Sequence, residues 1–243
     1  MRLGEFAKTL NEGGNVFPGT VAIQPDYVQG IIDGVKKMLP GFAMQPHIGS
    51  AGFKKVPAGD MDIFLDAGDV IAKMKATDEK DAKQKLSAYF KGKGIDAAVK
   101  GRNVHIKYPL PDGTFGQVDL MVIPDAEAVA PWHQHGPRGS YADPEFKGSD
   151  IFILMNSIAK TLGLKFDAFG GKLLRRDDNS VVASDRDAVA KILLDKGATA
   201  DDLNSAKSIL ARLKLDPRRD EKLAQARQDA EKGVLSLKPE ALA

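Results

Sequence analysis

The sequence has 243 residues, of which 43% are hydrophobic and 28% are charged, with a formal net charge of +2 and no cysteine. This length suits one large domain or two smaller ones, and the near-balance of charge excludes a general attraction to nucleic acid. The lack of cysteine excludes disulfides, zinc–thiolate sites and cysteine nucleophiles. No apolar run reaches the roughly 20 residues of a membrane span, and the first residues lack a signal peptide's apolar core. We therefore expect a cytoplasmic protein without a membrane partner.

The chain begins with an alternation of helices and strands. A helix is expected to start at Pro25 and to end before Pro40-Gly41, because apolar residues recur at helical spacing between them. Strands are expected over residues 42–48 and 61–65. The ten or so residues that follow Gly49-Ser50 contain Gly52, Pro57 and Gly59, which leaves room for a turn or a short helix only.

Further elements complete a sheet region. Helices are expected over residues 69–74 and 78–91, and strands over residues 95–99, 104–110 and 116–123. The last two strands are joined by Pro-Asp-Gly-Thr, which is a strong hairpin signal.

The composition changes after this region. Residues 126–148 are rich in Pro and Gly and are expected to form a connecting loop. The remaining segment, 149–243, is expected to be mainly helical, with helices near 149–162, 185–196, 200–213 and 217–232 and a small hairpin at 166–183. The fold class is therefore α+β, with a mixed sheet flanked by helices in residues 1–125 and a helical region at the C-terminal end.

Three acids of the sheet region are candidates for chemistry. Asp60 and Asp62 are two residues apart where a strand begins, so their side chains point to the same face. Asp119 lies between Val118 and Leu120 on another expected strand. A carboxylate among apolar residues is costly without a partner, and a divalent cation is a suitable one. Three such carboxylates on adjacent strands are able to hold two Mg²⁺ ions for phosphoryl or nucleotidyl transfer.

A second feature precedes the first two acids. Gly49-Ser50 follows an expected strand, and such a turn offers backbone N–H groups and a hydroxyl to phosphate oxygens. Lys54 and Lys55 add positive charge for a polyphosphate.

This combination resembles the signature of the polymerase β-like nucleotidyltransferase superfamily. The signature consists of an apolar residue, Gly-Ser, a gap of about nine residues, an acid-x-acid pair flanked by apolar residues, and a third acid on a later strand. The resemblance covers roughly residues 40–123. The Gly-Ser to Asp segment departs from the family because Pro57 and two glycines shorten the usual helix. The sequence as a whole, including its Gly-Glu-Phe-Ala-Lys start, also resembles nucleotidyltransferase-like proteins encoded by bacteriophages. This resemblance would place the protein in the host cytoplasm.

The resemblance implies roles for these residues. Asp60 and Asp62 would ligate two Mg²⁺ ions (or Mn²⁺), and Asp119 would complete the metal site and orient or deprotonate the acceptor hydroxyl. Gly49 and Ser50, with Lys54 and Lys55 beside them, would hold the phosphates of an NTP such as ATP. The helical region from residue 149 would bind the base or the acceptor, with Lys147 to Asn156 beside the nucleotide.

The expected activity is metal-dependent transfer of a nucleoside monophosphate from an NTP to a hydroxyl, with release of pyrophosphate. The acceptor is an RNA end such as tRNA, a protein or a small molecule. Two alternatives stay open: a non-catalytic or weakly catalytic nucleotide-binding or virion protein on the same fold, and an unrelated phosphate-ester hydrolase that uses the same acids.

Other polar residues have plainer interpretations. His133 and His135, next to Trp132, are interpreted as ordinary loop histidines, because the sequence offers no third metal ligand near them. His105 is interpreted as structural or exposed. A basic cluster is interpreted as a solvated face, with contact to a phosphate as the alternative; its members are Lys172, Arg175, Arg176 and Arg186.

Overall fold

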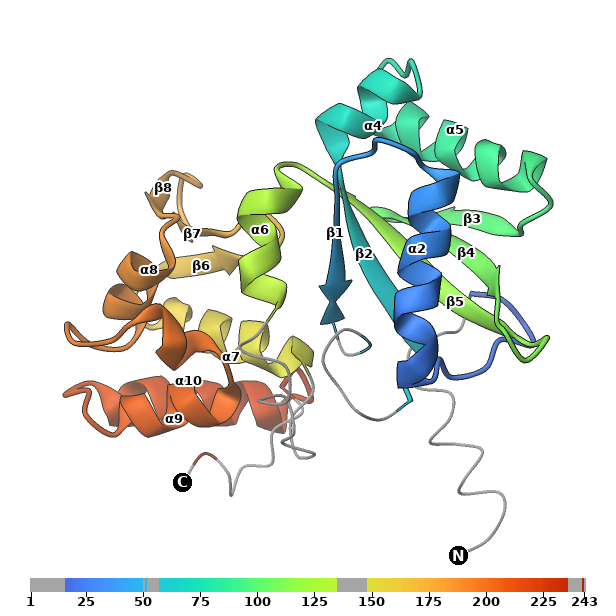
Figure 1. Cartoon of the computed structure of the whole chain (residues 1–243). Coiled ribbons are helices and arrows are strands. Elements are labelled where there is room, and N and C mark those ends of the chain that lie inside the picture. The colour runs from blue at the N-terminus through green and yellow to red at the C-terminus, as the bar shows by residue number, and fades with distance from the viewer. Residues whose placement is uncertain (1–15, 50, 52–56, 135–147, 236–241, 243) are drawn as a thin grey trace, which may run out of the picture. The chain divides into compact units, whose positions relative to one another are not determined.

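The computed structural model describes residues 16–49, 51, 57–134, 148–235 and 242 (Figure 1). The chain divides into two compact units, Met1–Gln134 and His135–Ala243, so the first unit ends nine residues beyond the expected boundary at 125. The first unit contains a mixed sheet flanked by helices and the second is mainly helical, which confirms the α+β class. None of the helices in the described residues is both long enough and apolar enough to cross a membrane.

The described elements of the first unit follow the expected alternation. In chain order they are the 3-10 helix η1 (Pro25–Tyr27), α2 (Val28–Met38), β1 (Met44–Ile48), β2 (Asp60–Asp66), α4 (Ala67–Lys73), α5 (Glu79–Gly92), β3 (Ala97–Lys100), β4 (Asn103–Pro109), β5 (Phe115–Ile123) and α6 (Ala126–His133).

The five strands form one sheet in the order β1-β2-β5-β4-β3. The central pair, β2 and β5, is parallel, and each other neighbouring pair is antiparallel. A parallel pair needs a long crossover connection, and the chain between β2 and β5 supplies it through α4, α5 and the β3–β4 hairpin. The two strands that carry the expected acids are therefore direct neighbours at the centre of the sheet.

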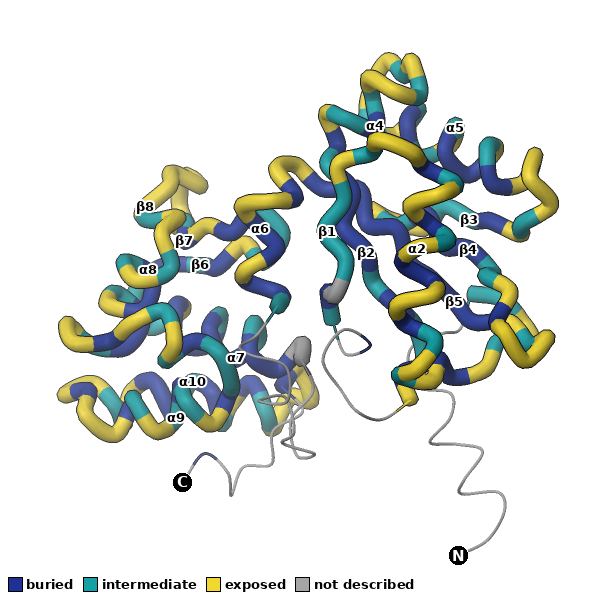
Figure 2. Tube along the Cα trace, in the orientation of Figure 1, coloured by how far each residue is buried: buried dark blue, intermediate teal, exposed yellow. Residues whose placement is uncertain are grey.

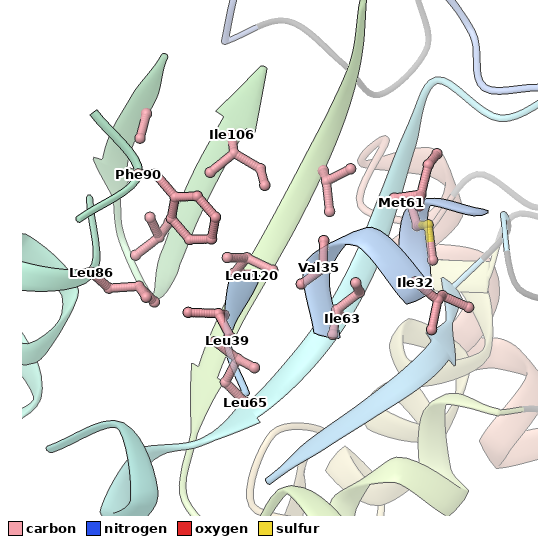
Figure 3. Close-up of a cluster of buried hydrophobic side chains, with 14 of the residues drawn as sticks. Ile32, Val35, Leu39, Met61, Ile63, Leu65, Leu86, Phe90, Ile106 and Leu120 are labelled. Atoms are coloured by element: carbon pink, nitrogen blue, oxygen red, sulfur yellow. The ribbon is translucent and has the colours of Figure 1, made fainter. Parts of the chain in front are cut away.

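The alternation of side chains gives this sheet two unlike faces. Met61, Ile63 and Leu65 of β2 are fully buried in a hydrophobic core that α2 and α5 complete (Figure 3). The stripe of α2 that enters this core is the one expected from its helical spacing: Val28, Ile31, Ile32 and Val35. The intervening residues of β2, which include Asp60 and Asp62, point to the other face. Figure 2 shows how deeply the central strands are buried.

The segment at 126–133 corrects the sequence prediction, because α6 stands where a loop was expected. Asp125 caps this helix by accepting a hydrogen bond from the Ala128 amide. Pro131 lies in the last turns, where the loss of one N–H donor is tolerated in a short helix that buries an apolar side. Trp132 and His133 are buried, and the His133 ring meets Phe64 of β2 edge-on at 4.9 Å between centroids. His135 lies outside the described residues.

The second unit combines helices with a small antiparallel sheet of order β6-β7-β8. Its described elements are α7 (Gly148–Lys160), β6 (Leu164–Asp167), β7 (Lys172–Arg175), β8 (Val181–Ala183), α8 (Arg186–Leu193), the 3-10 helix η2 (Ala200–Leu203), α9 (Ala206–Leu213) and α10 (Arg219–Glu231). The single helix expected over residues 200–213 is divided, because Ser205 is extended and caps α9.

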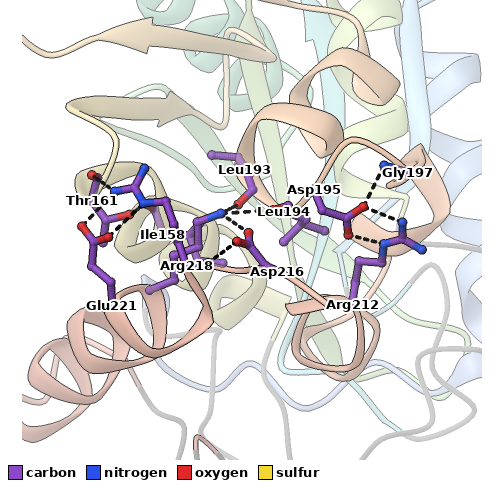
Figure 4. Close-up of polar contacts among 11 residues, drawn as sticks. Ile158, Thr161, Leu193, Leu194, Asp195, Gly197, Arg212, Asp216, Arg218 and Glu221 are labelled. Carbon is purple, nitrogen blue, oxygen red and sulfur yellow. Dashed lines mark hydrogen bonds and ion pairs between the residues drawn. The ribbon is translucent and has the colours of Figure 1, made fainter. Parts of the chain in front are cut away.

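Several ion pairs of this unit involve residues in or next to the segments that join its helices (Figure 4). Arg212 binds Asp195 through two nitrogens at 2.5 and 2.6 Å, and Arg218 binds Glu221 in the same way at 2.8 and 2.9 Å. Lys222 is buried, where it pairs with Asp216 and donates to the Leu193 and Leu194 carbonyls.

Candidate active site

The sheet brings Asp60, Asp62 and Asp119 together on one face. In the parallel β2–β5 pair, Asp62 stands directly opposite Asp119, and Asp60 stands opposite Gln117. Paired residues on neighbouring strands have side chains on the same side, with strands about 5 Å apart. The three carboxylates therefore share the face that is opposite the α2–α5 core, as the sequence pattern predicts for a joint site.

Gly49 lies against this group at the end of β1. Its backbone has φ +67°, and a Cβ at this position would come within 2.5 Å of Asp62 Oδ2. Only glycine adopts this conformation without strain and leaves room for the carboxylate. The Gly of the Gly-Ser pair therefore lies beside Asp62, whereas Ser50, Lys54 and Lys55 lie outside the described residues.

Burial and the neighbouring negative charges both raise the pKa values of carboxylates in the site. Burial raises the pKa of Asp60 to about 6, with a further contribution from the charge of Asp119. Burial also raises the pKa of Asp62 well above its usual value, and the charges of Asp60 and Asp119 add to the effect. Among the described residues, no side chain forms an ion pair with Asp60 or Asp62 or donates a hydrogen bond to them. These two carboxylates are thus held at a cost that a cation would relieve.

Asp119 has a different environment. It is 5% exposed, and its Oδ1 lies 2.7 Å from His105 Nδ1 and 2.9 Å from Gln117 Nε2. Asn103 Nδ2 is 3.4 Å from Oδ2. Asp119 is therefore supported by side-chain donors, whereas no described side chain donates to Asp60 or Asp62.

The donor set fits a divalent cation that arrives together with a phosphate ligand. Mg²⁺ prefers oxygen ligands, and it is commonly bound through one or two carboxylates plus substrate phosphates. Asp60 and Asp62 supply two such carboxylates, and neither pairs with a side chain in the part of the chain that the structure describes. Within the described ranges, no group of three or more His, Asp or Glu side chains is already arranged around an ion position.

His105 and Gln117 are the residues that the sequence interpretation missed. The sequence interpretation of His105 as structural or exposed did not link it to the acids; the residue is buried, in line with the structural alternative, and bonds to Asp119. The signal for it exists only once the β4–β5 register is known, because His105 stands directly opposite Asp119 in that antiparallel pair. Gln117 shares a face with Asp119 by alternation, and this relation is visible in the sequence.

The basic cluster of the second unit is partly structural. Arg176 donates to the Leu164 carbonyl, and Arg186 donates to the Asn204 side chain. Lys172 and Arg175 lie on β7 and are exposed, which agrees with the interpretation of a solvated face. The apolar stripe of α7 (Ile151, Leu154, Met155 and Ile158) is buried, so it is not available to line a nucleotide site.

No protein-family model matches the sequence, and no curated protein matches it significantly.

Proposed function

We propose that the protein is a metal-dependent nucleotidyltransferase, which moves a nucleoside monophosphate from an NTP to an acceptor hydroxyl and releases pyrophosphate. One observation carries the proposal. Asp62 and Asp119 face each other in register on adjacent parallel strands, with Asp60 on the same face and the Gly49 backbone against Asp62. The resemblance of the sequence to the polymerase β-like superfamily rests on the same residues.

Each residue has a defined task in this proposal. Asp60 and Asp62 hold Mg²⁺, or Mn²⁺, together with the triphosphate, and the Gly49 turn leaves space for phosphate oxygens beside them. When bound, the metal supplies positive charge that stabilises the phosphates and favours ionisation of the attacking hydroxyl. Asp119 orients that hydroxyl and accepts a hydrogen bond from it.

The chemistry is an in-line displacement. The acceptor oxygen forms a bond to the α-phosphorus, the bond from that phosphorus to the bridging oxygen of the β-phosphate breaks, and pyrophosphate leaves. The hydroxyl proton passes to the Asp119 carboxylate, which accepts the hydrogen bond from that hydroxyl. Such reactions depend mainly on positioning and electrostatic stabilisation, which is what a rigid pair of central strands provides.

The acceptor is best identified by labelling. Each α-³²P-labelled NTP is incubated with the protein and Mg²⁺ or Mn²⁺, with total RNA, with a protein extract or alone, and label is followed into RNA, protein and small molecules. We expect label from at least one NTP in one acceptor class. Asp60→Asn and Asp62→Asn should lower the rate by at least about 100-fold, since each removes a ligand of the metal–nucleotide complex.

Asp33→Asn is the matched control. Asp33 is exposed on α2, at the other face of the sheet, so its loss changes the net charge equally without touching the site. Metal-dependent NTP binding without any transfer would instead identify a nucleotide-binding protein that lacks the reaction. Absence of both binding and transfer would contradict the proposal.

A further inference from the structure

The side chains around Asp119 form a connected chain of hydrogen bonds that reaches the backbone of residue 16. The Val16 amide is 2.9 Å from Gln117 Oε1, Gln117 Nε2 is 2.9 Å from Asp119 Oδ1, and His105 Nδ1 is 2.7 Å from the same oxygen. Gln117 and His105 are buried, at 0% and 6% exposure. The network is therefore shielded from exchange with bulk water.

The direction of each hydrogen bond follows from one fixed donor. A backbone amide only donates, so the atom of Gln117 that faces Val16 must be the oxygen, and the NH₂ group must face Asp119. A carboxylate only accepts, so His105 must carry its proton on Nδ1 to bond with Asp119. This places the two short donor contacts on the same oxygen, Oδ1.

The other oxygen of Asp119 is left nearly unused. Its closest donor is Asn103 Nδ2, at the long distance of 3.4 Å. A carboxylate oxygen that already accepts two short hydrogen bonds is a poor ligand for anything else, whereas Oδ2 keeps its lone pairs.

We infer that His105 and Gln117 are positioning residues, which fix the Asp119 carboxylate so that Oδ2 is the atom offered to the acceptor hydroxyl or the metal. This inference rests on the proposed nucleotidyl transfer. It separates the acids into two classes. No described side chain donates a hydrogen bond to Asp60 or Asp62, which hold the nucleotide complex, whereas the Asp119 carboxylate is pre-oriented by neighbouring side chains and serves the acceptor.

The kinetic test uses substitutions at His105. His105→Leu removes the donor at similar size, and His105→Asn places an amide donor close to the position of Nδ1. Loss of a residue that orients a carboxylate typically costs 10–100-fold, so we expect His105→Leu to lower kcat by that factor with KM for the NTP nearly unchanged. His105→Asn should restore most of kcat.

Gln117→Met is a second test of the network, and Ser157→Ala is the control. Gln117→Met keeps the side-chain length and removes the donor, and it should lower kcat in the same way. Ser157 is buried in the second unit, where it bonds to Asp229 at 2.8 Å. Ser157→Ala thus deletes a buried hydrogen bond to a carboxylate in the other compact unit and should leave kcat unchanged.

A spectroscopic test does not depend on activity. Histidine ¹H–¹⁵N NMR spectra of the wild-type protein should show a proton on Nδ1 of His105, with the signal assigned by its loss in His105→Asn. An unprotonated Nδ1 would overturn the hydrogen-bond assignment and the inference with it. This measurement also serves if His105→Leu fails to fold.

The outcomes separate this inference from the proposed function. Normal kcat in folded His105→Leu, or a change confined to KM, overturns the positioning role while the proposed function stands. A wild-type protein that shows the Nδ1 proton but neither binds nor transfers any NTP overturns the proposed function and the role together.

Discussion

At the scale of single residues, the candidate site is a group of acids that repel one another. Asp62 lies between Gly49 on one side and Asp119 on the other, with Asp60 on the same face. Burial raises the pKa values of Asp60 and Asp62, and the neighbouring carboxylates raise them further. The protein therefore maintains an arrangement that lowers its own stability, as is common where residues are placed for function.

The first prediction concerns stability and pH in the absence of metal. Because the pKa of Asp60 is about 6 in the folded protein, and about 4 when unfolded, the folded state binds more protons between these values. The contribution of Asp60 to the free energy of unfolding is therefore lost as pH rises from about 4 to about 6. Asp60→Asn should be more stable than the wild type above pH 6, by at most about 3 kcal/mol.

Urea denaturation in EDTA at pH 4.5 and pH 7.5 measures this difference. The advantage of Asp60→Asn over the wild type should grow between the two pH values, and that of Asp33→Asn should not. An advantage that is equal at both pH values would show that the pKa of Asp60 is not raised in the folded protein.

At the scale of elements, the end of β1 determines how closely the backbone approaches the acids. Gly49→Ala should destabilise the protein by about 1–2 kcal/mol, because an L-residue is strained at φ +67°. It should also displace the Asp62 carboxylate, since the new methyl group would meet Oδ2 at 2.5 Å. We therefore expect loss of NTP binding in addition to the loss of stability.

Gly41→Ala is the control for that experiment. Gly41 has φ +77° in the turn before β1, and a Cβ there would meet no atom within 4 Å. The two variants share the backbone strain, and only Gly49→Ala alters the site. Equal NTP binding by both, measured by calorimetry with Mg²⁺ present, would show that the approach of Gly49 to Asp62 has no role.

The elements also show what the sequence is able to predict. The stripe of α2 and the Pro-Asp-Gly-Thr turn between β4 and β5 are local signals, and both elements are found. Helix α6 was missed, because Pro131 and the neighbouring histidines are typical of loops, whereas burial of Val129 and Trp132 stabilises the helix. Tertiary packing overrides local propensity in such short elements.

For the site, the sequence predicts which residues share a face of one strand but not which residues of strands distant in sequence stand opposite each other. Alternation within each strand places Asp60 with Asp62, and Gln117 with Asp119, on common faces. The pairing of His105 with Asp119 depends on the register of β4 against β5, and that of Asp62 with Asp119 depends on a parallel pairing across a long crossover. The β4–β5 register follows from the hairpin turn that joins these strands, but the β2–β5 register depends on contacts between segments distant in sequence, which no local pattern specifies.

At the scale of the whole molecule, the chain forms two compact units, and the unfolding of the first unit is observable separately. The only tryptophan of the sequence, Trp132, is buried in α6 of the first unit. The buried Lys222–Asp216 pair belongs to the second unit. Unfolding of the first unit is therefore visible by fluorescence, while circular dichroism reports on both.

Lys222→Met should destabilise the second unit by about 3–5 kcal/mol, because it leaves Asp216 buried without its partner. The double variant with Asp216→Leu should recover much of this loss. In urea, we expect the circular dichroism transition of Lys222→Met to shift to lower concentration while the Trp132 transition stays in place. A joint shift of both transitions would show that the units unfold as one.

The parallel pairing of β2 with β5 also has a consequence for how the chain folds. These strands are distant in sequence, so their pairing pays the loop-closure entropy of the whole crossover before it gains its contacts. The same step brings Asp62 against Asp119, so electrostatic repulsion opposes the association that topology already makes slow. The acids of the candidate site are therefore also expected to slow the assembly of the sheet.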